Sequence, residues 1–211
     1  MKILFCGYRT WSIRAYDILG RVFDLASSPQ ELEEKTSKAH YDIIFFVGWS
    51  WMIEQQLMQS SKCICMHPSP LPKYRGGSPI QNQIINGEKE SAVTFFVMDE
   101  KMDHGKILWQ EKLSLEGDLA SIFLDMSLLT KAGILHILNN PNDEGKEQDH
   151  SQATIYKRRK PKDSEIKPED FYASTAEELY NKIRCLQGPY PKPFIKCRDG
   201  TILYITGAKC D

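Results

Sequence analysis

Apolar runs alternate with amphipathic segments along most of the chain. The apolar runs predict strands at residues 2–6, 41–47, 63–66, 91–98 and 107–115. The amphipathic or helix-compatible segments predict helices at residues 12–23, with Ser12 as N-cap, and at 28–38, 52–58, 78–85 and 119–138. The runs 2–6 and 41–47 contain almost no polar residue, as is typical of parallel strands covered on both faces. We therefore predict an α/β fold, a Rossmann-like and mostly parallel sheet with helices on both faces.

The pattern changes after residue 138. Residues 139–152 are rich in Asn, Asp, Glu and Gly and predict a surface loop, and residues 157–162 form the basic cluster KRRKPK. The elements predicted beyond them are a helix at 175–186, with a capping box at Thr175 and Glu178, and short strands at 193–197 and 201–205. We therefore predict a main domain over residues 1–150 and a small C-terminal α+β lobe over residues 151–211.

Composition and charge narrow the class of protein. The 211 residues are 41% hydrophobic and 26% charged, with a formal net charge of −1, which argues against a dominant nucleic-acid surface. We find no apolar run near the ~20 residues of a membrane span, and the N-terminal run before Gly7 is too short for a secretory signal. The six cysteines show no CxxC spacing, so we expect no metal site. A cytoplasmic protein without membrane contact is expected.

One stretch stands out for chemistry, CICMHPSPLPKYRGG at residues 63–77. His67 follows a predicted strand, at the carboxyl edge of the sheet where ligands of such folds bind. Asp103 lies in the loop after the next predicted strand and could face the same crevice, where the two would serve acid–base work. A structural histidine and a capping aspartate are the alternative. The first turn, from Gly7 to Trp11, lacks the repeated glycines of a dinucleotide site.

Longer motifs carry a resemblance to a known family. The string HPSPLPKYRGGSPIQ, then NGE at 86–88, then VTFFVMDEKMDHGKIL resembles the formyltransferases that use N10-formyltetrahydrofolate. The positions that match the family signature are His67, Ser69, Leu71, Pro72, Tyr74, Arg75, Gly76, Asp103 and Gly105. IYKRRKPKDSEI and IRCLQGPYPKPF resemble the region after the catalytic domain in methionyl-tRNA and sugar formyltransferases. The resemblance covers nearly the whole chain and makes residues 1–150 the expected catalytic domain.

The resemblance implies roles for individual residues. His67 would donate to the formyl oxygen, while Asp103 would orient His67 and help take the proton of the attacked amine. Folate would bind between two segments, in a pocket formed by Trp49, Trp51, Met52, Ile53, Val97 and Met98. The two tryptophans are equally well interpreted as packing residues. The acceptor substrate would contact Tyr8, Arg9, Trp11, Ser69, Lys73, Tyr74, Arg75 and Gly76.

Cys65 departs from the family pattern, because the family has an asparagine there that donates to the formyl oxygen. A thiol is a weak donor. Three interpretations are open: a thiolate nucleophile activated by His67, a weak donor or spacer in a catalytic position, or an inert buried cysteine. We favour the second, since direct attack by an amine requires no covalent step. Cys65 should share a face with His67, because alternate strand residues do so.

The acceptor expected from the resemblance is the amino group of a nucleotide-linked sugar. The tRNA enzymes carry a further C-terminal domain, for which we expect no room past Asp211. The expected partner is therefore a small sugar nucleotide of surface-polysaccharide synthesis and no nucleic acid, with a homodimer as an open option. Two alternatives are a formyltetrahydrofolate hydrolase and a catalytically weakened relative that binds folate or sugar.

Overall fold

A six-stranded sheet forms the centre of the molecule in the computed structural model, which describes residues 1–188 and 190–210. Its spatial order is β2-β1-β3-β4-β6-β7. The strands are β1 (Ile3–Cys6), β2 (Asp24–Ala26), β3 (Ile43–Val47), β4 (Lys62–His67), β6 (Glu90–Val97) and β7 (Ile107–Ser114). The first four of that spatial order are parallel, while β6 and β7 pair antiparallel. The expected mostly parallel sheet is confirmed.

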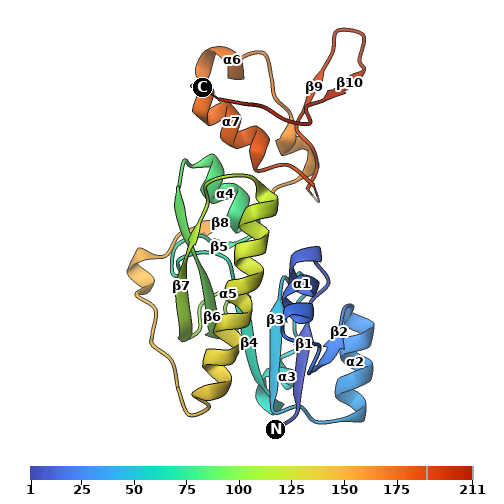
Figure 1. The fold of residues 1–211 in the computed structure, drawn as a ribbon, viewed down its shortest axis with the longest axis vertical. Coiled ribbons are helices and arrows are strands. Elements are labelled where there is room, and N and C mark those ends of the chain that lie inside the picture. The colour runs from blue at the N-terminus through green and yellow to red at the C-terminus, as the bar shows by residue number, and fades with distance from the viewer. Residues whose placement is uncertain (189, 211) are drawn as a thin grey trace.

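Helices cover both faces of this sheet (Figure 1). They are α1 (Thr10–Ile18), α2 (Pro29–Lys38), α3 (Gln55–Ser60), α4 (Pro79–Ile85) and α5 (Leu119–Asn139). Alternate residues of the central strands enter two separate cores: Phe5 and Phe45 belong to one, Leu4 and Ile44 to the other. Burial on both faces explains why these strands read as uninterrupted apolar runs.

Helix α5 is long and apolar enough to cross a membrane by length and composition alone. The expectation that no segment has this property was therefore wrong. In the fold, α5 packs against α1, β6 and β7, and eight of its residues are buried, Ile122, Met126 and Ile134 among them. The apolar residues among these serve a core helix, and the high mean hydropathy of α5 reflects its contact with α1 and the sheet.

The C-terminal segment first runs past β5, beside which its β8 lies, and then continues beyond α4 to the opposite end from the N-terminus (Figure 1). Its elements are η1 (His150–Gln152), β8 (Ile155–Tyr156), η2 (Pro161–Ser164), α6 (Asp170–Ala173), α7 (Ala176–Arg184), β9 (Phe194–Lys196) and β10 (Ile202–Tyr204). β8 pairs with β5 (Arg75–Gly76), and Cys185 and Leu186 enter the main core. A boundary at residue 150 remains a prediction, and Pro189 of the expected Pro-Tyr-Pro turn lies outside the described residues.

Some element bounds differ from expectation for local reasons. α1 begins at Thr10 after Arg9, because the Ser12 hydroxyl donates to the Arg9 carbonyl inside the first turn instead of capping the helix. α1 ends at Ile18, shortly before Gly20, which has a φ of +82° that ends a helix. The strands β2, β5 and β8 were not predicted, since they are two or three residues long.

Candidate active site

His67 is the last residue of β4, at the carboxyl end of the parallel part of the sheet. It is 6% exposed. Its Nε2 lies 2.8 Å from the carbonyl oxygen of Tyr74, and since a carbonyl only accepts, Nε2 carries a proton. Its Nδ1 lies 3.7 Å from Oδ2 of Asp103. Nδ1 is therefore the ring nitrogen that faces the carboxylate and is left for chemistry.

Asp103 reaches His67 because its loop folds back over the sheet. β6 runs antiparallel to β4, so the carboxyl end of β6 does not lie beside His67. Residues 98–106, here called the aspartate loop, return along the sheet, and a Cβ at Gly105 would lie 1.8 Å from the Val97 carbonyl oxygen. Asp103 itself has a φ of +52°, and its Oδ2 accepts from the Gly76 N–H at 2.8 Å. The carboxylate is thus tied to the backbone opposite.

Residues 68–77, here called the proline loop, are held by their own polar side chains. The buried Ser69 hydroxyl donates to the Lys73 carbonyl at 2.8 Å. Tyr74 is also buried, stacks on Tyr156 with 4.8 Å between ring centroids, and donates its hydroxyl to Glu88. Ser69 and Tyr74 therefore shape the loop that presents a carbonyl to His67. Lys73 is the exposed side chain among the expected acceptor contacts of this loop.

Arg75 occupies a different place from the one expected for a substrate-binding cation. It is 5% exposed, and its guanidinium donates to Gln148 Oε1 at 2.5 Å and lies 2.9 Å from His150 Nδ1. These contacts brace the proline loop from within, and a contact of Arg75 with the acceptor stays a prediction. Gly76 contributes backbone only, since a Cβ there would lie 2.3 Å from the Tyr156 carbonyl oxygen.

Cys65 shares a sheet face with His67, as alternation in β4 requires, and is one of the partly buried side chains, with Trp49 and Met98, that pack against the core cluster on that face. Burial, and then the negative charge of Asp103, raise the pKa of the Cys65 thiol well above its usual value. A thiol held in its neutral form is a poor nucleophile. The environment of Cys65 thus disfavours the covalent interpretation and leaves the spacer and the inert cysteine.

Three of the residues expected to bind folate pack against one core cluster, and their contact with folate stays a prediction. Trp49 and Ile53, from the turn after β3, and Met98, from the start of the aspartate loop, pack on the same core cluster as Cys65. Trp49 Nε1 is buried and has no hydrogen-bond partner in the described part of the chain. A buried donor without an acceptor is costly, so this atom suits a polar group of a bound ligand.

Other expected pocket residues lie elsewhere. The Val97 side chain packs into the core on the opposite face of the sheet, and only its backbone meets the aspartate loop: its N–H donates to the Lys106 carbonyl at 2.9 Å, and its carbonyl lies against Gly105. Met52 is 91% exposed and lies at the surface, whereas Trp51, 41% exposed, packs edge-on against Trp49 with 4.8 Å between ring centroids. The two segments are joined at the surface, where Gln55 Nε2 donates to Glu100 Oε1 at 2.5 Å.

Two of the expected acceptor contacts form a polar and aromatic cluster beside the turn after β3. The Tyr8 hydroxyl donates to Ser50 at 2.8 Å, and the Arg9 guanidinium lies 4.7 Å above the Tyr8 ring and 3.3 Å from the same serine oxygen. The Trp51 ring lies 4.5 Å from that of Tyr8. Trp11 is 7% exposed and belongs to the main core, so its expected contact with the substrate stays a prediction.

Sequence reasoning missed residues of the segment expected to be a surface loop. Gln148 is 5% exposed and bonds to both the proline and the aspartate loop. The ring of His150 stacks on that of His104, with 3.8 Å between centroids. A single glutamine in a polar segment carries no periodic signal, so only the fold reveals it. Over residues 1–188 and 190–210, no cluster of three metal-ligating side chains is found.

Comparisons with known proteins agree on one family. The sequence model described as formyl transferase matches residues 22–124. The methionyl-tRNA formyltransferase of Sulfurovum sp. is 30% identical over 164 residues, which cover 76% of this chain and 52% of the relative. The chain spans about half the length of the curated relatives it matches.

Solved structures share the fold over the full length of the chain. A methionyl-tRNA formyltransferase from Clostridium thermocellum is 28% identical with a TM-score of 0.83, and the match covers 97% of each chain. A 4-N formyltransferase from Francisella tularensis is 20% identical with a TM-score of 0.74, covering 100% of this chain and 98% of that one. The second similarity concerns the fold alone.

Proposed function

Because the chain belongs to the formyl transferase family, we propose that it transfers the formyl group of N10-formyltetrahydrofolate to an amine. The observation that carries the proposal is the approach of His67 Nδ1 to Asp103 Oδ2, at 3.7 Å, on two segments inside the matched region. Both groups are largely buried, with side-chain exposures of 8% and 14%. A buried acid–base pair at the carboxyl end of a sheet suits group transfer.

The reaction forms a C–N bond between the amine and the formyl carbon and breaks the C–N bond to the folate. The amine loses one proton and the folate nitrogen gains one. Negative charge develops on the formyl oxygen, where a proton on His67 Nδ1 would stabilise it. Asp103 would accept the amine proton, and its bond to the Gly76 N–H keeps the carboxylate in place meanwhile.

The donor substrate would bind where Trp49, Ile53 and Met98 meet Cys65. The apolar side chains fit a flat ring system, and the unpaired Trp49 Nε1 could donate to one of its acceptors. In this arrangement Cys65 is a spacer beside the formyl group, which supports attack by the amine without a covalent enzyme intermediate.

We propose a nucleotide-linked amino sugar as the acceptor. A formal net charge of −1 supports a small acceptor over a nucleic acid, and the Francisella 4-N formyltransferase, which shares the fold over the whole chain, shows that this fold occurs in an enzyme described as such. Lys73 and Arg9 are the cations available to a diphosphate, and Tyr8 offers an aromatic face. The product would be an N-formylamino sugar of the kind built into surface polysaccharide.

A second candidate acceptor is methionyl-tRNA. The observation in its favour is sequence similarity, because the curated relatives and the Clostridium structure carry that description. The chemistry at His67 and Asp103 would be the same. A third outcome, hydrolysis of the donor, needs only water in place of the amine.

An acceptor screen tests the proposal. Purified protein and N10-formyltetrahydrofolate are incubated with a panel of nucleotide-linked 4-amino sugars, with methionyl-tRNA, or without acceptor, and the products are weighed by mass spectrometry. The proposal expects a gain of one formyl group on a sugar nucleotide. If methionyl-tRNA is formylated and the sugar nucleotides stay unmodified, the acceptor is methionyl-tRNA and the proposed sugar is wrong. Formate released without any acceptor would indicate a hydrolase. No turnover at all, with folate bound, would contradict catalysis.

A further inference from the structure

The Gln148 side chain joins the two loops of the candidate site. Its Oε1 accepts from the Arg75 guanidinium in the proline loop at 2.5 Å. Its Nε2 donates to the carbonyls of Asp103, at 3.1 Å, and Gly105, at 2.7 Å, in the aspartate loop. The amide orientation follows from these partners, because a guanidinium only donates and a carbonyl only accepts. Gln148 thus satisfies three buried or half-buried groups at once.

These bonds act on the same pair of segments that Asp103 itself connects. Asp103 Oδ2 accepts from the Gly76 N–H, and Gly76 follows Arg75 directly. Asp103 also has a φ of +52°, a backbone conformation that costs free energy and persists only when neighbours enforce it. The Gln148 amide supplies such enforcement at the Asp103 carbonyl. Without it, the Asp103 and Gly105 carbonyls lose a donor and the guanidinium loses an acceptor.

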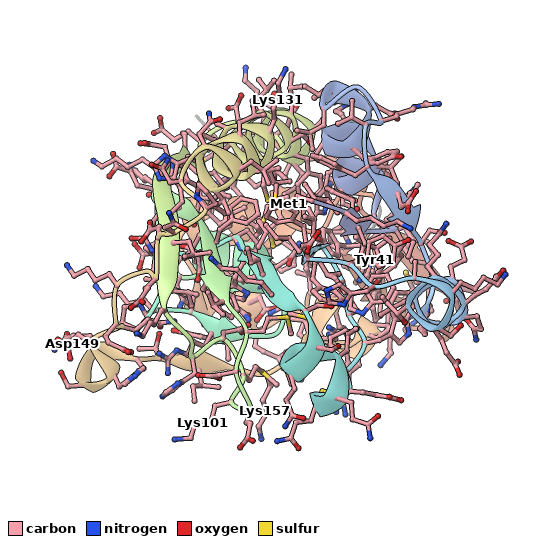
Figure 2. All side chains as sticks on the ribbon, turned by 90° about the horizontal axis from the view of Figure 1, so that it is seen from below. Met1, Tyr41, Lys101, Lys131, Asp149 and Lys157 are labelled. Carbon is pink, nitrogen blue, oxygen red and sulfur yellow. The ribbon has the colours of Figure 1, made fainter. Side chains whose placement is uncertain are left out.

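The place of Gln148 in the molecule suits this task. It lies between α5 and η1, outside the sheet, and reaches inward, whereas the adjacent Asp149 stands at the edge of the molecule (Figure 2). Gln148 contacts neither His67 nor any atom expected to react. Its effect on the site therefore passes through the backbone of Asp103.

We propose that Gln148 is a positioning residue, whose amide holds the aspartate loop against the proline loop so that the Asp103 carboxylate stays bonded to Gly76 and faces His67. The catalytic consequence rests on the proposed formyl transfer. The structural consequence does not rest on formyl transfer, because the Gly76 N–H is bonded to the Asp103 carboxylate and its hydrogen exchange reports on that bond.

Hydrogen exchange of single backbone amides, followed by NMR, measures that consequence. In Gln148→Met, which is close in size but cannot form the three bonds, exchange at Gly76 should accelerate about tenfold or more. Exchange at Gly77, whose N–H donates to the Tyr156 carbonyl at 2.8 Å, should stay within about twofold. Asp103→Ala defines full loss of protection at Gly76. Equal acceleration at both glycines would indicate general loosening and overturn the proposal.

A second variant separates the role of the amide oxygen of Gln148, which accepts from Arg75, from that of the amide nitrogen, which donates to the aspartate loop. Gln148→Glu keeps an acceptor for Arg75 but cannot donate to the carbonyls of Asp103 and Gly105. The proposal expects Gly76 to exchange as fast in Gln148→Glu as in Gln148→Met. Protection equal to wild type in Gln148→Glu would show that bracing of Arg75 is sufficient and would overturn it. Gln152→Met, an exposed position bonded to Ser151, is the matched control and should match wild type.

Kinetics complete the test. In both Gln148 variants, kcat for formyl transfer should fall about tenfold or more, while KM for donor and acceptor stays within about twofold, since Gln148 contacts neither. An unchanged kcat in a variant whose Gly76 amide has lost protection would refute a positioning role. If wild-type protein transfers no formyl group, the proposed function fails, and the exchange measurement still decides whether Gln148 places Asp103.

Discussion

Single residues in the candidate site owe their chemical state to their partners. The Tyr74 carbonyl holds a proton on His67 Nε2, and the Gly76 N–H binds the Asp103 carboxylate. Burial keeps the Cys65 thiol neutral. The first two effects come from backbone groups that the reaction itself would not use. The two predictions at this scale follow from them.

His67→Ala and Asp103→Ala should each lower kcat by about 100-fold or more, because a group that stabilises developing charge typically contributes that much. Circular dichroism should show a retained fold, since His67 is the last residue of its strand and Asp103 lies in a loop. The matched control is Asp99→Asn, a carboxylate of the aspartate loop that bonds to His104 and not to His67. Folded variants with near-normal turnover would contradict the assignment.

Cys65 should resist alkylation in the native protein at pH 8, because burial and the Asp103 charge raise the pKa of its thiol. Labelling with iodoacetamide and mass spectrometry measures this, with the exposed Cys197 as internal control. Cys65→Ala should retain measurable activity, and Cys65→Asn should retain or improve it. A formyl adduct on Cys65 when donor is supplied without acceptor would establish covalent catalysis and refute this expectation.

At the scale of elements, α5 shows how packing can reverse an intrinsic preference. Replacing a glycine by alanine in the middle of a helix normally stabilises the helix by about 1 kcal/mol. At Gly133, however, a Cβ would lie 2.5 Å from the Phe95 ring and 2.7 Å from the Trp109 ring. The glycine allows α5 to approach the sheet beneath it.

Gly133→Ala should therefore lower the free energy of unfolding, by about 1–3 kcal/mol, as overpacking does. Chemical denaturation monitored by circular dichroism provides the measurement. Leu128→Ala, at a 48% exposed position of the same helix, should change stability by less than about 0.5 kcal/mol. A stabilised Gly133→Ala would show that the sheet can move away at little cost.

The N-terminus of α5 predicts a pH dependence. The Asp118 carboxylate accepts from the Ser121 backbone N–H at 2.8 Å, and this bond, followed by one from the Ser121 side chain, lowers the pKa of Asp118. A lowered folded-state pKa adds stability above the unfolded value, near 3.9, that is lost as the pH falls through the folded value.

Asp118→Ala should accordingly cost about 1 kcal/mol at pH 7, the usual value of an N-cap, and progressively less below about pH 4. Urea titrations at several pH values measure the difference from wild type. Asp118→Asn retains a capping oxygen without the charge and should show a smaller, nearly pH-independent cost. A cost of Asp118→Ala that is constant down to pH 3 would argue against the charged cap.

At the scale of the whole molecule, the C-terminal segment is tied to the main fold. Arg184 in α7 donates to the carbonyls of Leu115 and Gly117, at the turn before α5. Leu186 is 2% exposed within the main core, while β8 lies beside β5 in the proline loop. Residues on both sides of position 150 therefore build one core and one site.

Unfolding of the full chain should accordingly be a single cooperative transition, in which Leu186→Ala costs about 2–5 kcal/mol, as for other buried leucines. Leu203→Ala, at a 57% exposed position of β10, should cost less than about 0.5 kcal/mol. Calorimetry measures both. Two separate transitions, with only the weaker one shifted by Leu186→Ala, would support independent domains divided near residue 150.

The sequence by itself determined the fold class and the central site. Uninterrupted apolar runs identify strands covered on both faces, because such burial tolerates no polar side chain. The positions of His67 and Asp103, in a resemblance that spans most of the chain, identify the pair that the fold brings to 3.7 Å. Both signals lie in short stretches of the chain, as a periodic pattern or as a contiguous motif. They can therefore be recognised from the sequence without knowledge of the tertiary structure.

The tertiary structure decided which side chains of those motifs face a ligand and which brace the site. Arg75 and Trp11 match a substrate contact by residue type, yet both are buried against distant segments. The polar neighbours of Gln148 predict a solvated loop, yet its side chain binds Arg75 and Asp103 together. The direction of a side chain depends on what packs against it, and residues 45 and 73 positions apart in sequence leave no pattern that records their contact.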